Sequence, residues 1–390
     1  MIRDRKVRLA IITTHPIQYY APIFRLLHEQ FQIEIKVFYT WGKLAQDKYD
    51  PGFNKNINWD IPLLEDYPYE WIPNTSNDPG SHHFKGIINP DLVQMIAAYK
   101  PNAILIYGWA YHSHLKAIRH FKNKIPVLFR GDSTLLDQQP GIKRFARSVL
   151  LKWIYKHIDH SFYVGSNSKA YFKKHGLKET QLTFAPHAID NQRFALSQPD
   201  EIKQLRQKLQ LKDDDVLLLF AGKFEDKKDP LLLLNAFIKL NNAKAKLLFV
   251  GNGELEQQLK HEARGLTNIH FMGFQNQSYM PVIYQACNIF CLSSKGPGES
   301  WGLTVNEAMA CGKAILVSDK AGCAIDLVKP GVNGYIFKAG SSVDLQNKLA
   351  YLADKTIFEL KNMGDASAKI IENWSFTVQV ESIIAVLNKI

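Results

Sequence analysis

Short runs of Val, Ile, Leu and Phe alternate with longer amphipathic segments along this chain, and the alternation starts afresh in the second half. Each buried strand of a parallel sheet is followed by a crossover helix, so this rhythm is typical of α/β domains. A polar stretch, 192–213, separates the two series, and 390 residues are too many for one compact core. We therefore expect two Rossmann-like doubly wound domains, 1–195 and 196–373, which face each other across a cleft and bind ligands at the carboxyl ends of their strands.

The first half contains apolar runs suited to buried strands, separated by helical patterns. The strands are expected at Arg8–Thr13, Ile33–Tyr39, Ala103–Tyr107, Pro126–Phe129, Ser161–Val164 and Leu182–Ala185. The helices are expected at Pro22–Gln30, Pro90–Tyr99, Ser113–Phe121, Ile142–His157 and Ser168–His175. The segment Thr40–Ser81 is rich in Asn, Asp, Pro and Trp, which indicates an irregular insertion.

The second half repeats the pattern after a leading helix. The strands are expected at Val216–Phe220, Lys246–Val250, Ile269–Met272, Ile289–Leu292 and Ala314–Val317. The helices are expected at Ile202–Leu209 and Pro230–Leu240. The strand Val216–Phe220 is apolar at every position, as expected for a strand buried on both faces.

Positive charge is concentrated in the first half. Residues 1–195 carry 26 Lys and Arg against 16 Asp and Glu, whereas residues 196–390 carry 22 against 21. The excess predicts an anionic surface or substrate for the first half. The segment Lys143–His157 mixes basic and large apolar residues at helical spacing, so it either rests on an anionic membrane leaflet or has an apolar core face and a basic solvated face. No nucleic-acid-binding motif accompanies the charge.

The sequence has neither a membrane-spanning or signal segment nor metal-binding cysteine spacing, and this predicts where the protein is located and the redox state of its cysteines. No run approaches the 18 to 20 apolar residues that span a bilayer, and the apolar run Val7–Thr13 is too short for a signal peptide and lacks a cleavage site. The four cysteines show no metal-binding spacing, so we interpret them as reduced structural thiols. We expect a cytoplasmic protein that is neither exported nor membrane-spanning, with peripheral contact at the inner face of the plasma membrane as one interpretation of the basic helix.

The strongest chemical signal is the segment Gly296–Gly312, in which a Gly/Pro-rich loop leads from a buried strand into a helix starting at Leu303 or Thr304. Glycines let backbone N–H groups approach a ligand, and a helix N-terminus favours a phosphate. Glu299 in the loop and Glu307 in the helix would repel a phosphate. We therefore expect these two carboxylates to face neutral hydroxyls of a sugar and a ribose.

A second element follows the strand Val216–Phe220. Gly222 permits a tight turn, and Lys223 leaves the strand end toward the expected cleft. Lys228 enters the next helix, and the two cations could bracket a diphosphate without a metal ion. Spacing alone does not decide whether Lys228 or its neighbour Lys227 contacts the phosphate. The alternative to a phosphate site is a surface loop in which these lysines are simply solvated.

The two elements together resemble family 4 of the retaining glycosyltransferases, which have the GT-B fold. Glu299 and Glu307 stand at the spacing of the family's Glu-x7-Glu signature, and Lys223 and Lys228 match its phosphate-binding pair, with Lys223 where Arg is common and Asp229 where Gly is common. The resemblance covers residues 160–340 and extends in outline to 374–390. It implies that this last helix packs back on the first domain.

The family resemblance also implies roles for individual residues. Glu307 would hold the donor ribose and Glu299 would lie beside the donor sugar. The loop after Ile269–Met272, with Phe274, would meet the base through backbone contacts. Backbone groups of the donor loop would contact sugar and phosphate; these belong to Gly222, Ser300, Trp301, Gly302, Leu303 and Thr304.

The acceptor half shows fewer signals. His15 and Gln18 follow the first strand where the family often has a Gly-rich loop, so His15 is a candidate catalytic residue, with capping of the helix as its alternative. Trp109 follows another strand end, beside His112 and His114, which we interpret as cap and packing residues. Arg130 and Asp132 follow a third strand end and either bind the acceptor or pair with each other.

These features predict a retaining, metal-independent glycosyltransferase that uses a UDP- or GDP-linked donor and a glycan or lipid-linked glycan acceptor in cell-surface polysaccharide or glycolipid synthesis. No cofactor is expected: the nucleotide sugar is a co-substrate, and no Asp-x-Asp or His/Cys ligand set lies near the donor loop. Retention is implied by the resemblance. Two alternatives stay open: an epimerase or hydrolase of nucleotide sugars, and a catalytically silent subunit that tethers a complex to membrane.

Overall fold

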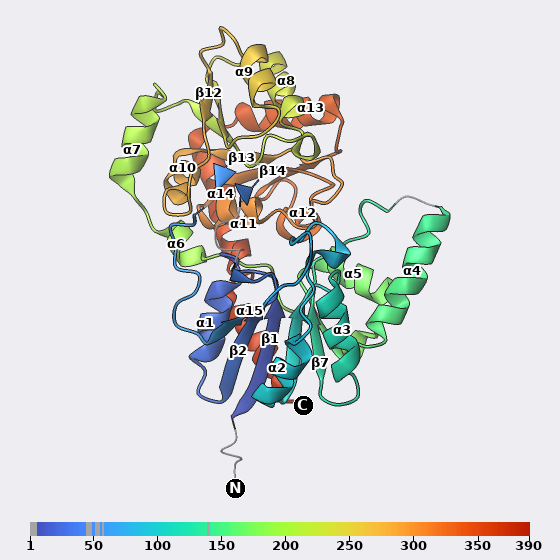
Figure 1. Cartoon of the computed structure of the whole chain (residues 1–390). Helices are drawn as coiled ribbons and strands as arrows, with labels where there is room; N and C mark the ends of the chain where they lie inside the picture. Colours follow the sequence, from blue (N-terminus) through green and yellow to red (C-terminus); the bar gives the residue numbers. More distant parts are fainter. Residues whose placement is uncertain (1–5, 44–48, 51–54, 57, 139–140) are drawn as a thin grey trace. The chain divides into compact units, whose positions relative to one another are not determined.

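The computed structural model describes residues 6–43, 49–50, 55–56, 58–138 and 141–390. The chain divides into two compact units, each built around its own parallel sheet (Figure 1). The first unit consists of Met1–Lys48, Ile61–His187 and Phe376–Ile390, and the second of Tyr49–Asp60 and Ala188–Ser375.

A parallel sheet in the order β5-β2-β1-β6-β7-β8-β9 forms the centre of the first unit. Its strands are β1 (Val7–Thr13), β2 (Ile33–Tyr39), β5 (Tyr69–Trp71), β6 (Ala103–Tyr107), β7 (Val127–Arg130), β8 (His160–Tyr163) and β9 (Leu182–Phe184). Strand β6 is buried at all five positions because helices cover both faces of the sheet.

Two apolar clusters cover the opposite faces of this sheet. One contains alternate residues of β1 and β2 with α1 (Ala21–His28) and α15 (Phe376–Leu387). The other contains the intervening strand residues and the remaining helices of the unit, which are α2 (Leu92–Tyr99), α3 (His112–Phe121), α4 (Ile142–Tyr155) and α5 (Ser166–Lys174). The last helix of the chain thus completes the core of the first unit.

The second unit has a parallel sheet in the order β12-β11-β10-β13-β14-β15. Its strands are β10 (Val216–Ala221), β11 (Ala245–Val250), β12 (Ile269–Met272), β13 (Ile289–Leu292), β14 (Ala314–Ser318) and β15 (Gly334–Phe337). The helices are α6 (Asn191–Ala195), α7 (Pro199–Lys208), α8 (Pro230–Leu240), α9 (Glu256–Glu262), α10 (Met280–Ala286), α11 (Leu303–Ala310), α12 (Ala324–Leu327), α13 (Ser342–Ala353) and α14 (Ile357–Ile371). Strand order reverses between β10 and β13, so the loops after these two strands lie side by side.

The segment Tyr49–Asp60 comes from the first half of the sequence but groups with the second unit. It contains the two-stranded pair β3 (Tyr49–Asp50) and β4 (Lys55–Asn56). The carbonyl of Asn58 accepts a hydrogen bond from Asn276 Nδ2 at 2.6 Å, and the carboxylate of Asp60 accepts one from the backbone N–H of Ser278 at 3.1 Å. The expected insertion 40–81 is therefore partly structured, although 44–48, 51–54 and 57 lie outside the described residues.

Four predicted strands and one predicted helix match their observed bounds: β2, β6, β12, β13 and α8. The other predicted elements are present with ends displaced by one to three residues. The described helices include none whose length and apolar character would let it cross a membrane.

Candidate active site

The loop between β13 and α11 is fixed by the loop that follows β14. Gly322 donates its N–H to the carbonyl of Glu299 at 3.1 Å, and Cys323 donates to the carbonyl of Trp301 at 3.0 Å. A Cβ on Gly322 would stand 1.7 Å from the carbonyl oxygen of Ser300, so only glycine allows this approach. The backbone of Glu299–Trp301 is thereby held rigidly at the carboxyl edge of the sheet.

Glu299 and Lys228 meet across the point where the strand order reverses. Lys228 Nζ contacts Glu299 Oε2, and the Ser294 hydroxyl donates to the same oxygen at 2.7 Å. Lys228 follows β10 and Glu299 follows β13, and the two side chains are only 18% and 12% exposed. The structure thus brings together the acid and the cation that the sequence singled out from separate segments.

Lys227 points to a different environment from its neighbour. Its Nζ lies 3.2 Å from Glu225, and its side chain is 46% exposed. Lys228 therefore is the lysine of this pair that reaches the loop after β13. The backbone at Asp229, where the family commonly has Gly, is left-handed with φ of +49°, which explains why glycine suits that position.

Lys223 leaves β10 directly after Gly222 and is half-buried. The loop that carries it is packed against the loop after β11, because Gly222 donates its N–H to the carbonyl of Val250 at 3.0 Å. A Cβ on Gly251 would stand 1.9 Å from the Gly222 carbonyl oxygen. Close backbone packing thus fixes the exit of Lys223 from the sheet.

Glu307 lies in the second turn of α11 and is 2% exposed. The hydroxyl of Tyr284, on α10, donates to its Oε2 at 2.8 Å. The helix begins at Leu303, as predicted, after Gly302 in a left-handed conformation. In the first turn, the buried hydroxyl of Thr304 has no hydrogen-bond partner within the described structure.

Other predicted donor-side residues have structural contacts of their own. The indole of Trp301 is buried and donates Nε1–H to Asn306 at 2.9 Å. Because the Trp301 carbonyl also accepts from Cys323, this residue braces the loop. Phe274 donates its N–H to Asn252 Oδ1 at 2.8 Å, and its ring lies 6.3 Å from that of Trp59.

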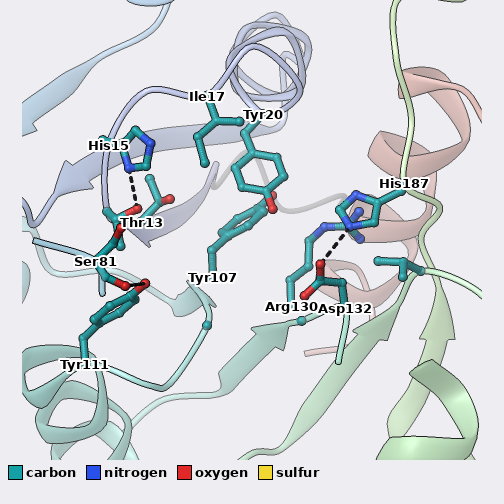
Figure 2. A pocket seen from close by; sticks show the side chains of 14 residues that line it. Thr13, His15, Ile17, Tyr20, Ser81, Tyr107, Tyr111, Arg130, Asp132 and His187 are labelled. Atoms are coloured by element: carbon teal, nitrogen blue, oxygen red, sulfur yellow. Dashed lines mark hydrogen bonds and ion pairs between the residues drawn. The ribbon is translucent and has the colours of Figure 1, made fainter. Parts of the chain in front are cut away.

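The first unit contains a polar cavity of about 240 Å³ at the carboxyl ends of β1, β6 and β7 (Figure 2). It is lined by Thr13, Thr14, His15, Ile17, Tyr20, Ser81, Tyr107, Gly108, Tyr111, Arg130, Gly131, Asp132, Val164 and His187. The predicted acceptor-side residues Arg130 and Asp132 and the candidate His15 therefore share one cavity.

Arg130 is buried beneath this cavity and is engaged in packing. Its Nη atoms donate to the carbonyls of Ala185 at 2.6 Å and Pro186 at 2.9 Å, and to Gln379 Oε1 at 3.2 Å. Burial lowers the pKa of the guanidinium. The residue thus ties the segment after β9 and helix α15 to the end of β7.

Asp132 lies beside His187, whose Nε2 is 3.6 Å from Asp132 Oδ2 (Figure 2). His187 is 5% exposed, whereas the Asp132 side chain is 46% exposed and reaches the cavity. Burial lowers the pKa of His187, and the neighbouring carboxylate opposes that shift. The proximity of His187 to Asp132 was not predicted from the sequence.

His15 Nδ1 lies 2.8 Å from the Thr14 hydroxyl, and its ring packs edge-on against Trp41. Gln18 is half-buried and does not line the cavity. His114 is fully buried: Nδ1 donates to the carbonyl of Gly108 at 2.9 Å, and Nε2 faces the Thr40 hydroxyl at 2.8 Å. His114 is a packing residue, as predicted.

Beside the polar cavity lies a second, mainly apolar one of about 560 Å³. Its walls are Ser81, His82, His83, Phe84, Trp109, Ala110, Tyr111, Leu115, Leu150 and Ile154. Trp109, predicted as an acceptor-side residue, belongs to this cavity. Ser81 and Tyr111 line both cavities, and the Tyr111 hydroxyl donates to the Ser81 carbonyl at 3.3 Å.

Helix α4 contributes Leu150 and Ile154 to this cavity and is otherwise unusually exposed. Ile142 is 88% exposed, Phe145 is 73% exposed and Trp153 is 39% exposed. The helix also carries five Lys and Arg residues within Ile142–Lys156 and no acid. The apolar residues of α4 therefore do not all face the core. This differs from the interpretation in which the helix has an apolar core face and a basic solvated face.

Within the described residues, the group with metal-ligand chemistry is Asp78, His82 and His83 at the rim of the apolar cavity. Asp78 Oδ2 lies 3.3 Å from His82 Nε2 and 3.2 Å from His83 Nε2. This cluster was not predicted from the sequence. All three residues belong to the first unit.

The family model described as "Glycosyl transferases group 1" matches residues 201–370. That range contains Lys223, Lys228, Glu299 and Glu307. Residues 201–370 are a glycosyl transferases group 1 domain.

Two curated relatives of this chain are named for a lipid or a lipid-linked sugar. A phosphatidyl-myo-inositol mannosyltransferase from Mycobacterium leprae is 27% identical over 43% of this chain and 45% of its own length. An N,N'-diacetylbacillosaminyl-diphospho-undecaprenol alpha-1,3-N-acetylgalactosaminyltransferase from Campylobacter jejuni is 26% identical over 73% of this chain and 74% of its own length. The chain spans less than half the length of the first curated relatives that it matches, between 35% and 45%.

Solved structures extend the likeness to the whole chain. Anabaena HepE in complex with UDP superposes with a TM-score of 0.72 at 19% identity over 99% of this chain and 100% of that one. Sucrose-phosphate synthase from Thermosynechococcus elongatus gives a TM-score of 0.73 at 17% identity over 98% and 99%. At such identities the likeness shows the fold, which is the two-domain GT-B fold of glycosyltransferases.

Proposed function

We propose that this protein is a retaining, metal-independent glycosyltransferase that transfers a sugar from a UDP- or GDP-linked donor to a hydroxyl of a glycan or lipid-linked glycan. The observation that carries the proposal is the meeting of Lys228 and Glu299 beside the start of α11, at the carboxyl edge of the sheet. This edge of the sheet gathers lysines, a helix N-terminus and carboxylates. The lysines and the helix N-terminus suit an anionic phosphate group, and the carboxylates suit the hydroxyls of a sugar.

Breaking the bond between sugar and diphosphate leaves negative charge on the departing phosphate. Lys223, Lys228 and the N–H groups of Leu303 and Thr304 are the donors available to stabilise that charge. The buried Thr304 hydroxyl without a partner supports this assignment, since a phosphate oxygen would satisfy it. With lysines in this role, the reaction has no need of a divalent cation.

Glu307 is suited to bind the donor ribose. Tyr284 holds one of its carboxylate oxygens, which orients the group. A buried carboxylate that faces two vicinal hydroxyls accepts hydrogen bonds from both. Glu299 would bind hydroxyls of the transferred sugar, and the diphosphate would compete with it for Lys228.

The acceptor would use the polar cavity of the first unit, where Asp132 offers a carboxylate held by His187 and His15 lies nearby. Retention would follow from a same-face displacement in which a donor phosphate oxygen takes the proton of the acceptor hydroxyl. UDP bound to Anabaena HepE and the lipid-linked acceptors named for the curated relatives support the donor and acceptor classes. The basic, exposed helix α4 supports peripheral binding to the cytoplasmic leaflet.

Incubation with UDP- and GDP-sugars and extracted lipid-linked glycans tests the proposal. We expect a glycosylated product with the anomeric configuration of the donor, resolved by NMR, in the presence of EDTA. Release or epimerisation of the sugar without an acceptor would instead support a hydrolase or epimerase.

A further inference from the structure

The two cavities of the first unit differ sharply in chemistry although they share a wall. The polar cavity presents hydroxyl, histidine and carboxylate groups (Figure 2). The neighbouring cavity is lined mainly by apolar side chains from α3, α4 and the segments 81–84 and 109–111. The Tyr111 hydroxyl and the Ser81 carbonyl form the partition between them. A single ligand that occupied both would therefore be rich in hydroxyls at one end and apolar at the other.

The apolar cavity has the properties of a binding site and is more than an internal packing gap. Its volume, about 560 Å³, lies in the range of small-molecule sites. Leu150 is 45% exposed and Ala110 is exposed, so the cavity opens to solvent. Leaving such a wall in contact with water is unfavourable, and a hydrocarbon segment would remove that cost.

The charge of helix α4, which forms part of the cavity wall, suggests which apolar ligand fits. Helix α4 forms one wall and carries Lys143, Arg144, Arg147 and Lys152 without an acidic residue. His82 and His83 also line the cavity, and both contact the carboxylate of Asp78. A basic helix that forms part of an apolar cavity suits an amphiphile that is held in an anionic membrane.

We propose that the apolar cavity binds the hydrocarbon chain of an amphiphilic acceptor whose sugar headgroup lies in the polar cavity beside Asp132. The proposal rests on the proposed glycosyl transfer and narrows its acceptor class to glycolipids. Helix α4 has two separate roles in it: Leu150 and Ile154 line the chain site, and Phe145 and the basic residues face the membrane surface.

Alkyl glucosides that differ only in chain length test this proposal. Methyl and octyl β-D-glucoside, kept below the micelle concentration, are titrated against the full chain by saturation-transfer NMR. We expect octyl glucoside to bind at least about tenfold more tightly, since each fully buried methylene contributes a factor of about four. Equal binding of the two glucosides would overturn the proposal.

Two variants distinguish the cavity from the surface of the helix. Ala110→Trp fills the cavity from an exposed position, and Leu150→Asn makes its wall polar. Both variants should lower the ratio of the affinity for octyl glucoside to that for methyl glucoside to below about threefold. Phe145→Asn, on the same helix but outside the cavity, should leave the ratio unchanged. If Phe145→Asn lowered this affinity ratio as much as Ala110→Trp does, the octyl chain would bind to the surface of α4 and not in the cavity.

UDP and GDP titrations of the same samples separate this inference from the proposed function. If the wild-type chain binds neither nucleotide, the proposed function fails whatever the glucosides do. If it binds one of them while chain length has no effect, only the acceptor inference fails.

Discussion

Among the single residues, Lys228 allows the most direct test, because its neighbour Lys227 provides a matched comparison. Lys228 reaches Glu299 and is largely buried, whereas Lys227 is exposed beside Glu225. Removing one preorganised donor to a developing oxyanion typically costs 10² to 10³ in rate. We expect Lys228→Ala to lower kcat by about that factor and Lys227→Ala to change it less than about twofold, measured as product formed under saturating donor. Equal losses in the two variants would contradict this assignment.

Glu307 gives a prediction for donor binding. Glu307→Gln keeps the shape of the side chain and the contact with Tyr284 but weakens acceptance of two ribose hydroxyls. A charged hydrogen bond contributes about 1.5 to 3 kcal/mol, so UDP or GDP should bind about 10- to 100-fold more weakly in calorimetry. The affinity for inorganic pyrophosphate, which has no ribose, should stay the same. A matching loss for pyrophosphate would indicate a disturbed loop instead.

His114 makes stability depend on pH. Burial lowers its pKa to about 4, so below the ordinary value near 6.5 the unfolded chain takes up a proton that the folded chain does not. Stability is therefore lost as the pH falls from about 6.5 toward 4, by about 2 kcal/mol at pH 4.5. Urea unfolding at pH 7 and 4.5 measures how much of the free energy of unfolding is lost on acidification. We expect this loss to be smaller in His114→Gln than in the wild type. In His112→Gln, at an exposed position, the loss should equal that of the wild type. An identical acid loss in His114→Gln and wild type would exclude this role.

At the scale of elements, α4 predicts how the chain binds membranes. Each basic residue near an anionic surface contributes about 1 kcal/mol, or about fivefold in partitioning. Arg144→Gln combined with Arg147→Gln should weaken sedimentation with vesicles containing phosphatidylglycerol by about 10- to 30-fold. Binding to phosphatidylcholine vesicles, which carry no net charge, should not change. Tight binding of the double variant to anionic vesicles would show that α4 is not the contact.

Which elements could be predicted from sequence depends on their burial. Strands β6 and β13 are buried at every position, so an unbroken apolar run marks their bounds. Strand β5 was missed because Tyr69–Trp71 is a three-residue edge strand inside a polar segment, and β15 because it begins with Gly334. Periodicity also could not say that α4 exposes Phe145 and Trp153, since a helix with apolar residues on several sides fits either a core or a surface.

The candidate site was predictable where strand order alone brings residues together. Lys228 and Glu299 follow strands that are neighbours in a doubly wound sheet, so their meeting follows from the topology. The contact between Asp132 and His187 could not be predicted from the sequence. The two residues are far apart in the chain, and they meet only because the segment after β9 packs near the end of β7. The shared wall at Ser81 and Tyr111 similarly depends on how an irregular loop packs.

Across the whole molecule, the two halves of the chain differ in their chemistry. The first half carries nearly all of the net charge of +11, together with the two cavities and α4. The second half is nearly neutral and holds the lysines, the helix start and the acids of the glycosyl transferases group 1 domain. This separation suits a protein that meets an anionic, lipid-linked acceptor with one half and a soluble nucleotide sugar with the other.

We propose that Lys223, Lys228 and the start of α11 neutralise a nucleoside diphosphate without a metal ion. Calorimetric titration of UDP, GDP and their nucleosides in EDTA, with wild type and with the Lys223→Ala, Lys228→Ala double variant, measures this directly. We predict that one of the two diphosphates binds the wild type more tightly than its nucleoside does, and that the double variant binds both equally weakly. A wild type that binds neither diphosphate, or a double variant that still prefers the diphosphate as wild type does, would contradict the account.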